Sequence, residues 1–312
     1  MRLILWALGA LALILIVGAI AVQFAIWRNG PAVLDTVDRL TGGTRGVAKL
    51  AQVSTGDHPA QKVIIWGPED RSADSVPLPV LMFAHGGSWR SGDPEDYGFI
   101  ARALVPEGFL VALSGYRLVK EDAKDGVYPA MIEDTAEAVA RTRKAVAQYG
   151  GDPDRIVIMG HSAGAYNVVM TGLERVWLEE RGVSLDAVRG VVGLSGPYDF
   201  YPFTSDSTKA AFGPASDPEA TQAFNHVRGD AAPMLLIHGE KDTLVRPRNS
   251  RELAKLLETA GGEALLKLYP EMEHNDPLIA FASPWRDRRD VVETIATFAR
   301  DVTAKPSPAK NP

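Results

Sequence analysis

Hydrophobic residues are unevenly distributed along the chain, and the longest apolar run lies at its N-terminus. Residues 3–27 contain no charged side chain, and Gln23 is the only strongly polar one. A helix over this run is about 37 Å long at 1.5 Å per residue, enough to cross a hydrocarbon core of about 30 Å. The pattern predicts one transmembrane helix within residues 1–28, bounded by Arg2 and Arg28.

The same run has one feature of a cleaved signal sequence, the small-x-small tripeptide Ala19-Ile20-Ala21. Apolar residues continue to Trp27, however, whereas a cleavable hydrophobic region usually has about 7–15 residues. We therefore favour an uncleaved anchor, with secretion as the outcome of cleavage near Ala21. A short basic start favours export of the downstream chain, so we expect the rest of the protein on the periplasmic face. The basic residues after the run leave a cytoplasmic orientation open.

From residue 62 onward, short apolar runs alternate with longer segments of helical periodicity. The runs predict strands over Lys62–Trp66, Val80–Ala84, Leu110–Ser114, Arg155–Met159, Gly190–Leu194, Met234–His238 and Leu265–Leu268. Helices are predicted over Ala130–Gln148, Ala163–Glu179, Arg248–Ala260 and Arg289–Val302. Several strands are almost continuous in Val, Ile, Leu and Met, as in strands buried on both faces. This is the pattern of an α/β fold, a mostly parallel central sheet with helices on both faces.

The remaining segments differ in composition. Residues 29–57 contain glycine, proline and mixed charge, which predicts a linker with a short helix over Ala32–Leu40. Residues 305–312 are rich in proline and predict a disordered tail. The main domain is therefore expected over residues 58–304, with a small cap formed by an aromatic insertion at about residues 196–232.

Charge and cysteine content exclude several classes of protein. The 33 basic and 39 acidic residues give a net charge of −6, which argues against a general nucleic-acid binder. The chain has no cysteine, so it has no disulfide, no cysteine-ligated zinc, no iron–sulfur cluster and no thiol nucleophile.

The pentapeptide Gly160-His161-Ser162-Ala163-Gly164 directly follows a predicted strand and precedes a predicted helix. A serine on such a sharp turn is a typical exposed nucleophile, with small neighbours that relieve crowding. The helix N-terminus directs N–H groups toward developing negative charge. Ser162 is therefore the candidate nucleophile.

The segment His85-Gly86-Gly87-Ser88-Trp89 follows another predicted strand, where an oxyanion hole would be built. Its two glycines let the backbone approach a ligand closely. We expect the amides of Gly86, Gly87 and Ala163 to hold the oxyanion. Trp89 is expected either to line the alcohol side of the site or to pack beneath it.

A serine nucleophile needs a histidine base and a carboxylate that orients it. Asp242 lies in a loop just after a predicted strand, and Glu240 is the less favoured alternative. His274 is the only histidine that follows Asp242, so the order nucleophile, acid, base selects it. His161 is expected to point away from the site. The segment around His274 lacks the two-histidine spacing of a helical zinc site, so no metal or other cofactor is expected.

Together these motifs resemble the α/β-hydrolase superfamily. More narrowly, residues 61–66, 85–89 and 149–155 resemble the bacterial esterase branch that contains acetyl-xylan and feruloyl esterase-like proteins. Hormone-sensitive-lipase-like and kynurenine-formamidase-like proteins are relatives of that branch. Ser88 stands where the lipase pattern His-Gly-Gly-Gly has its third glycine.

The resemblance implies a serine carboxylesterase that acts on short- to medium-chain esters through an acyl-enzyme. Its catalytic residues would be Ser162, Asp242 and His274. Trp89, Tyr198 and Phe200 would contact a small-molecule ester substrate, although the cap aromatics could equally serve only to pack the insertion. An amidase, peptidase or thioesterase with the same triad is an alternative, as is a non-catalytic, membrane-tethered binding protein. The oligomeric state stays open.

Overall fold

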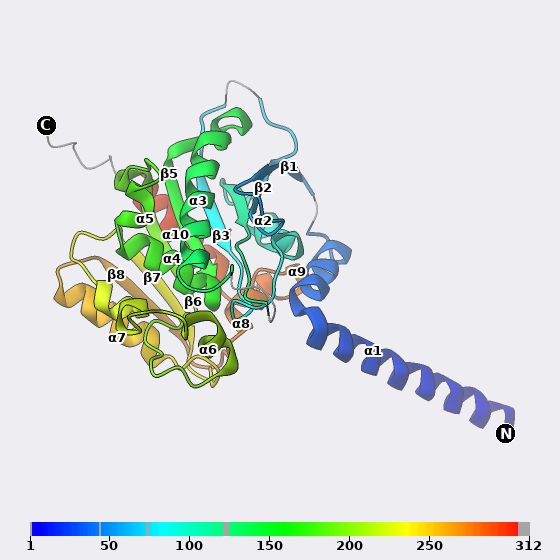
Figure 1. Ribbon diagram of the computed structural model, residues 1–312. Coiled ribbons are helices and arrows are strands. Elements are labelled where there is room, and N and C mark those ends of the chain that lie inside the picture. Colours follow the sequence, from blue (N-terminus) through cyan, green and yellow to red (C-terminus); the bar gives the residue numbers. More distant parts are fainter. Residues whose placement is uncertain (1, 44, 73–74, 121–124, 305–312) are drawn as a thin grey trace, which may run out of the picture.

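The computed structural model describes residues 2–43, 45–72, 75–120 and 125–304 (Figure 1). Its centre is one eight-stranded sheet of order β1-β2-β4-β3-β5-β6-β7-β8. The strands are β1 Val47–Ser54, β2 Lys62–Pro68, β3 Leu78–Ala84, β4 Leu110–Ser114, β5 Gly151–His161, β6 Val188–Leu194, β7 Met234–Gly239 and β8 Ala264–Tyr269. The pairs β1–β2 and β2–β4 are antiparallel, and every other pair is parallel. The predicted fold is therefore confirmed, while the tail at residues 305–312 lies outside the described residues.

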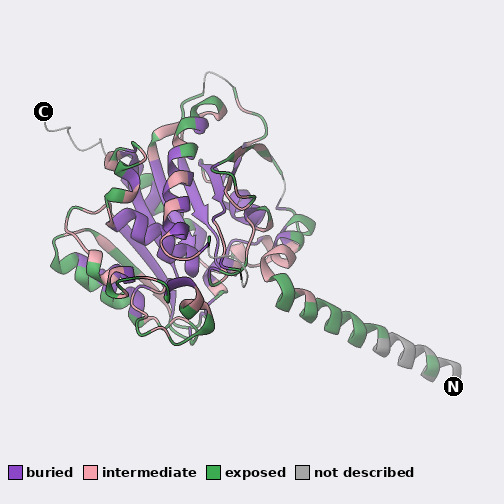
Figure 2. Cartoon of the chain, viewed as in Figure 1, coloured by how far each residue is buried: buried purple, intermediate pink, exposed green. Residues whose placement is uncertain are grey.

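Helices cover both faces of the sheet, and Figure 2 shows the buried strands between them. The α-helices of the described residues are α1 Arg2–Leu40, α2 Gly98–Leu104, α3 Ala130–Ala145, α4 Ala163–Leu173, α5 Val176–Glu179, α6 Asp206–Phe212, α7 Arg248–Thr259, α8 Asp276–Ile279, α9 Ser283–Arg286 and α10 Val291–Ala304. One core layer packs α3, α4 and α7 against the sheet, and the other packs α2 and α10. Strands β3 to β7 are buried on both faces, which explains why their sequences are continuously apolar.

All seven predicted strands are present, with ends that shift by a few residues. The helix expected over Ala163–Glu179 is interrupted, because α4 ends at Leu173 and a separate short helix, α5, follows. The insertion expected to form a cap contains α6 and two short 3₁₀ helices, Glu219–Thr221 and Ala223–His226.

The linker expected over residues 29–57 is wrong, because most of this segment belongs to the folded domain. It includes β1, which pairs along its whole length with β2 at the edge of the sheet. Only one residue of β1, Val47, is buried, so the strand lacks the apolar run that identified the others. An edge strand obtains its hydrogen bonds from one neighbour and needs little apolar burial.

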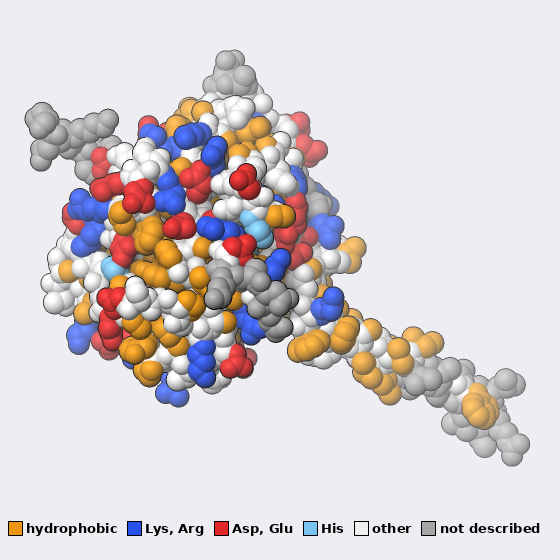
Figure 3. Space-filling view, in the orientation of Figure 1, with side chains coloured by type: hydrophobic (Ala, Val, Ile, Leu, Met, Phe, Trp, Pro, Cys, Tyr) orange, Lys and Arg blue, Asp and Glu red, His pale blue; other side chains and the backbone are white. Residues whose placement is uncertain are grey.

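Helix α1 consists of two segments joined at Asn29, whose backbone is extended rather than helical (φ −156°, ψ 80°). The Asn29 side chain accepts a hydrogen bond from the amide of Ala32 and so caps the second segment. Pro31 fits there because the first turn of a helix leaves its N–H groups unpaired. The first segment projects from the body with exposed apolar side chains (Figure 3). Within the described residues, Ile14–Leu40 is long and apolar enough to cross a membrane.

The second segment of α1 is fixed to the body by buried ion pairs. Arg102 of α2 donates to Asp38 (2.6 Å) and to Asp35 (2.5 Å), and the Arg102 side chain is only 3% exposed. Asp38 is completely buried and also accepts from the Ser283 amide (2.7 Å) and from Arg286 (3.1 Å). These contacts tie α1 to α2 and α9, so residues 30–40 are an integral part of the domain.

Candidate active site

Ser162 lies on the turn between β5 and α4, at the carboxyl edge of the sheet. Its backbone has φ 53° and ψ −118°, a region that a non-glycine residue rarely adopts. The strained turn is held on both sides: the Ser162 amide donates to the carbonyl of Leu194, and its carbonyl accepts from the amide of Tyr166. The turn therefore presents the hydroxyl above the sheet, as the pentapeptide predicted.

The two glycines of the pentapeptide are required by close backbone approach. A Cβ at Gly164 would overlap with the carbonyl oxygen of Ala84 at the end of β3. A Cβ at Gly160 would overlap with the backbone of Gly164 itself. Helix α4 can thus begin directly above the strand ends only where these side chains are absent.

Ser162, His274 and Asp242 come together although they lie on three different loops. The Ser162 hydroxyl lies 2.9 Å from Nε2 of His274, and Nδ1 of His274 lies 2.7 Å from Oδ2 of Asp242. A carboxylate can only accept, so Nδ1 carries the proton and Nε2 is free to accept from the hydroxyl. All three residues are at least nine-tenths buried. This is the geometry of a nucleophile, a base and an orienting acid.

Asp242 has all its hydrogen-bonding capacity used. Oδ1 accepts from the amides of Leu244 (2.9 Å) and Val245 (2.8 Å), and Oδ2 accepts from His274 and from His238 (3.1 Å). Burial by itself would raise the pKa of Asp242, but the hydrogen bonds from His238 and His274 outweigh it and hold the pKa well below its usual range. The carboxylate therefore stays ionised and can stabilise a charged His274.

His238 also contacts Asp242, a role that was not expected from its position at the end of a predicted strand. Nε2 of His238 faces two acceptors, Asp242 and the carbonyl of Val245 (2.7 Å), so Nε2 carries the proton. Nδ1 then accepts from the hydroxyl of Ser250 at 2.7 Å. The signal for this role is that His238 lies four residues before Asp242, at the carboxyl end of β7.

Two other buried histidines support loops of the site. Nε2 of His161 lies 3.0 Å from the carbonyl of His274, so its side chain approaches the base loop, and the expectation that it points away was wrong. Burial and the neighbouring His274 lower the pKa of His161 to about 3. Burial lowers the pKa of His85 to about 4, where the ring stacks on Tyr116 (4.5 Å between centroids). Both rings are therefore neutral at pH 7.

The loop after β3 lies directly beside Ser162. A Cβ built on Gly86 would be 3.3 Å from the Cβ of Ser162, which places this backbone next to the candidate nucleophile. Gly87 has φ +116°, a conformation that glycine adopts without strain. Within the described residues, the amides of Gly86, Gly87 and Ala163 donate no hydrogen bond to another group. All three remain candidates for an oxyanion hole.

The three residues expected to contact substrate have different environments. Tyr198 is completely buried and its side chain packs in the core, so its contact with substrate stays a prediction. Trp89 is 3% exposed and donates from its indole to Asn167 (3.0 Å). It packs edge-on against Phe212 at 4.8 Å, and Phe200, which is partly exposed, joins the same cluster.

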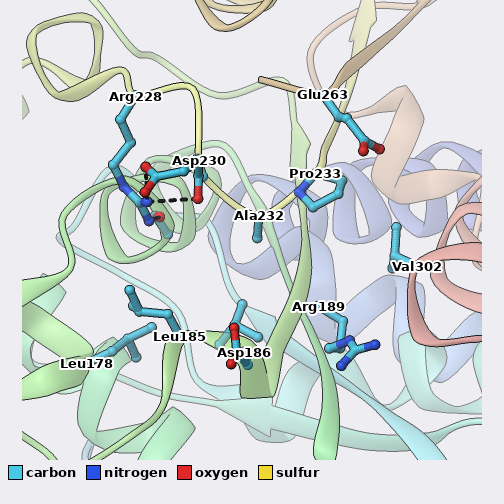
Figure 4. A pocket seen from close by; sticks show the side chains of 13 residues that line it. Leu178, Leu185, Asp186, Arg189, Arg228, Asp230, Ala232, Pro233, Glu263 and Val302 are labelled. Atoms are coloured by element: carbon cyan, nitrogen blue, oxygen red, sulfur yellow. Dashed lines mark hydrogen bonds and ion pairs between the residues drawn. The ribbon is translucent and has the colours of Figure 1, made fainter. Parts of the chain in front are cut away.

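One cavity of about 240 Å³ lies at the opposite, amino edge of the sheet, among the starts of β6, β7 and β8 (Figure 4). Two of its charged side chains pair with each other: Arg228 donates to Asp230, and also to the Leu173 carbonyl. The cavity therefore takes no part in the site around Ser162. Among the described residues, no group of three or more metal-ligating side chains is placed to hold a metal ion.

Comparison with known proteins places these features in a family. The BD-FAE family model matches residues 65–257. The probable isoprenylcysteine alpha-carbonyl methylesterase ICME of Oryza sativa is 27% identical over 84% of this chain and 67% of its own length. Esterase LipC of Mycobacterium tuberculosis is 28% identical over 66% of this chain and 54% of its own. The chain thus spans about half to two thirds of the length of these curated relatives.

Solved structures share the fold at lower identity. Esterase B from Lactobacillus rhamnosis, inhibited by a tributyrin-derived phosphonate, superposes with a TM-score of 0.73 and 20% identity, over 91% of this chain and 95% of that one. A truncated carbohydrate esterase from gut microbiota gives a TM-score of 0.68 and 20% identity, over 83% and 96%.

Proposed function

Since the chain belongs to the BD-FAE family of α/β-hydrolase esterases, we propose that it is a serine carboxylesterase for esters of short- to medium-chain acids. The observation that carries this proposal is the unbroken hydrogen-bond chain from the Ser162 hydroxyl through His274 to Asp242. The relatives named as esterases and methylesterases support an ester as the substrate.

The mechanism follows from the positions of the protons. Nε2 of His274 takes the hydroxyl proton as Ser162 attacks the ester carbonyl, and the amides of Gly86, Gly87 and Ala163 stabilise the oxyanion. Asp242 stays ionised and stabilises the imidazolium. The alcohol then leaves with the proton from His274. Water, activated by the same histidine, attacks the acyl-enzyme and releases the acid.

The preference for short to medium acyl chains is supported by how the space beside Ser162 is filled. Tyr166, one helical turn after Ser162, packs edge-on against Trp89 at 5.5 Å and against Phe200 at 5.5 Å. Phe212 closes the cluster from the insertion, 4.9 Å from Phe200. Such a filled layer limits the length of the acyl group, and the partly exposed Phe200 is the member that meets it. Leu244, 71% exposed and two residues after Asp242, offers an apolar contact outside this layer.

We further propose that residues 1–28 hold the enzyme in a membrane, with the folded domain that begins at the second α1 segment on the exported face and the insertion at residues 196–232 as its cap. The exposed apolar side chains of the first α1 segment support this attachment, because their burial in lipid removes them from water. Trp27 is 77% exposed and next to Arg28, an arrangement typical of the membrane–water interface.

The test is hydrolysis of p-nitrophenyl esters from acetate to palmitate by the full chain in detergent. We expect the highest kcat/KM between acetate and octanoate, and a loss of roughly 10⁴–10⁶ in kcat for Ser162→Ala. Ser114→Ala is the matched control, because this buried hydroxyl donates to the carbonyl of Phe83 and, within the described part of the chain, forms no hydrogen bond with Ser162, His274 or Asp242. Labelling by a fluorophosphonate should modify the wild-type chain and not Ser162→Ala. Labelling of both alike, or activity retained in Ser162→Ala, would refute the assignment.

A phenylalanine-to-alanine change tests the acyl limit separately. Phe200→Ala should move the optimum to longer chains, because it opens the aromatic layer beside Ser162. Phe298→Ala, in the core layer on the other side of the sheet, is the control for a general loss of packing. An unchanged optimum in Phe200→Ala would mean that the layer does not limit the acyl group.

A further inference from the structure

A second cavity lies between the two segments of α1 and the segment after His274. Its volume is about 810 Å³, within the 300–1,000 Å³ common for sites that bind small molecules. Its apolar lining comes from both sides of the bend at Asn29 and from α8 and α9, and includes Val22, Ile26, Val37, Leu278, Ile279 and Trp285. We call it the α1 groove.

The position of the α1 groove relative to the apolar segment indicates what fills it. Val22 and Ile26 precede Trp27, so this end of the groove lies in the part of α1 that we place in the hydrocarbon layer. Val22 is five residues, about 7 Å of helix, before the interface marked by Trp27. Val37, at the other end, belongs to the segment fixed to the body by Asp35 and Asp38. An apolar chain can therefore enter the groove directly from the bilayer.

Two basic side chains, Arg288 and Arg289, line the same groove. They lie between α9 and α10, and Asn275 and Asp276 also contribute to the lining. Arg289 pairs with Asp276 at 3.6 Å. Arg288 is exposed, and within the described part of the chain it forms no ion pair. A cation beside an apolar groove at a membrane surface matches an anionic headgroup attached to an acyl chain.

We propose that the α1 groove binds one acyl chain of an anionic bilayer phospholipid, with Arg288 at its headgroup. This assignment rests on the membrane attachment proposed above and not on the esterase reaction. The bound chain would fill the space between α1 and α8. Helix α8 begins two residues after His274, so the lipid lies behind the loop that carries the base.

The experiment uses the full chain in vesicles of phosphatidylcholine that contain a phosphatidylglycerol with a photoreactive diazirine on one acyl chain. After irradiation, mass spectrometry locates the label. A lipid that merely surrounds the anchor labels residues 14–28. A lipid in the α1 groove also labels the tryptic peptide 268–286, which carries Ile279 and Trp285. We expect label in both.

Two variants define the site. Ile279→Trp fills the groove and should abolish label in peptide 268–286 while residues 14–28 keep theirs. Arg288→Glu should lower the label in that peptide about fivefold or more with the phosphatidylglycerol probe, and little with a phosphatidylcholine probe of the same chain. Lys144→Glu is the charge-matched control, because Lys144 is exposed near the end of α3 at the amino edge of the sheet.

Three results would overturn the proposal: an unlabelled peptide 268–286 beside a labelled anchor, equal labelling in Ile279→Trp, or equal labelling by the two probes in the wild-type chain. If residues 14–28 carry no label, the membrane attachment itself fails, and the groove assignment fails with it. Hydrolysis of a water-soluble ester by the wild-type chain in the same vesicles tests the esterase proposal independently.

Discussion

Replacing Arg102 by methionine tests whether residues 30–40 are part of the catalytic domain. Methionine keeps most of the side-chain length but removes the charge that both Asp35 and Asp38 face. Asp38 has no access to solvent, so it cannot recover its lost partner from water. We expect Arg102→Met to destabilise the whole domain and to release the second segment of α1.

The magnitude depends on the contacts that remain around Asp38. Removing one partner of a buried ion pair costs about 3–5 kcal/mol. Arg286 at 3.1 Å and the Ser283 amide at 2.7 Å still contact Asp38, so the lower value of about 3 kcal/mol applies. For a domain of this size, 3 kcal/mol corresponds to a decrease in Tm of roughly 6–12 °C. A typical domain stability of about 5–15 kcal/mol leaves the variant folded at room temperature.

The assay is thermal unfolding of the full chain in detergent at pH 7, followed by near-UV circular dichroism. Arg39→Ala is the control, because Arg39 pairs with the same Asp35 at 3.1 Å but is 55% exposed. An exposed pair of this kind contributes only about 0.3–0.5 kcal/mol, so the Tm of Arg39→Ala should stay within about 2 °C of the wild-type value. If the two variants unfold within about 2 °C of each other, the buried cluster does not hold α1 to the domain.

Three further predictions concern the site and its supports. His238→Phe removes one donor from Asp242 and should lower kcat roughly tenfold at unchanged KM, the equivalent of one hydrogen bond to a charged group. His238→Gln should recover part of the loss, because its amide can still donate. A change in KM alone would contradict the positioning role of His238. Because the folded-state pKa values of His85 (about 4) and His161 (about 3) lie below the unfolded value of 6.5, the unfolded chain binds more protons below pH 6.5. Each group should therefore remove roughly 1 kcal/mol of stability per pH unit as the pH falls from 6 to 4. The free energy of unfolding, measured with urea, should fall less steeply with decreasing pH in His85→Gln than in the wild-type chain. Gly164→Ala should fail to yield folded protein, because its new Cβ would overlap with the Ala84 carbonyl. The control Ala165→Gly, on the same helix, should fold with a free energy of unfolding that is lower by about 1 kcal/mol. Soluble expression and circular dichroism distinguish these outcomes.

The features predicted correctly from sequence are those set by local constraints. A strand buried on both faces needs an unbroken apolar run, so β3 to β7 were recognisable without any contact information. The turn around Ser162 needs glycine at positions 160 and 164 for steric reasons, and those glycines are visible as a motif. The order of Ser162, Asp242 and His274 along the chain likewise identified the three side chains that meet at the sheet edge.

The features that sequence reasoning missed depend on partners far away in the chain. Strand β1 is an edge strand whose exposed residues carry little apolar signal, and its pairing is provided by β2. Tyr198 looks like any aromatic residue of an insertion, and only the packing shows that its side chain is completely buried.

The sequence by itself determined the fold class and singled out Ser162, Asp242 and His274, the three side chains that the structure joins by hydrogen bonds, because each depends on residue types at short or ordered spacing. Only the tertiary structure decided that residues 30–40 belong to the domain, because the ion pairs of Asp38 with Arg102 and Arg286 join three segments that are far apart in the sequence. It also decided that His238 supports Asp242 and that a groove opens beside α1. Burial and charge pairing between distant segments depend on how the elements pack, so a local sequence pattern does not predict them.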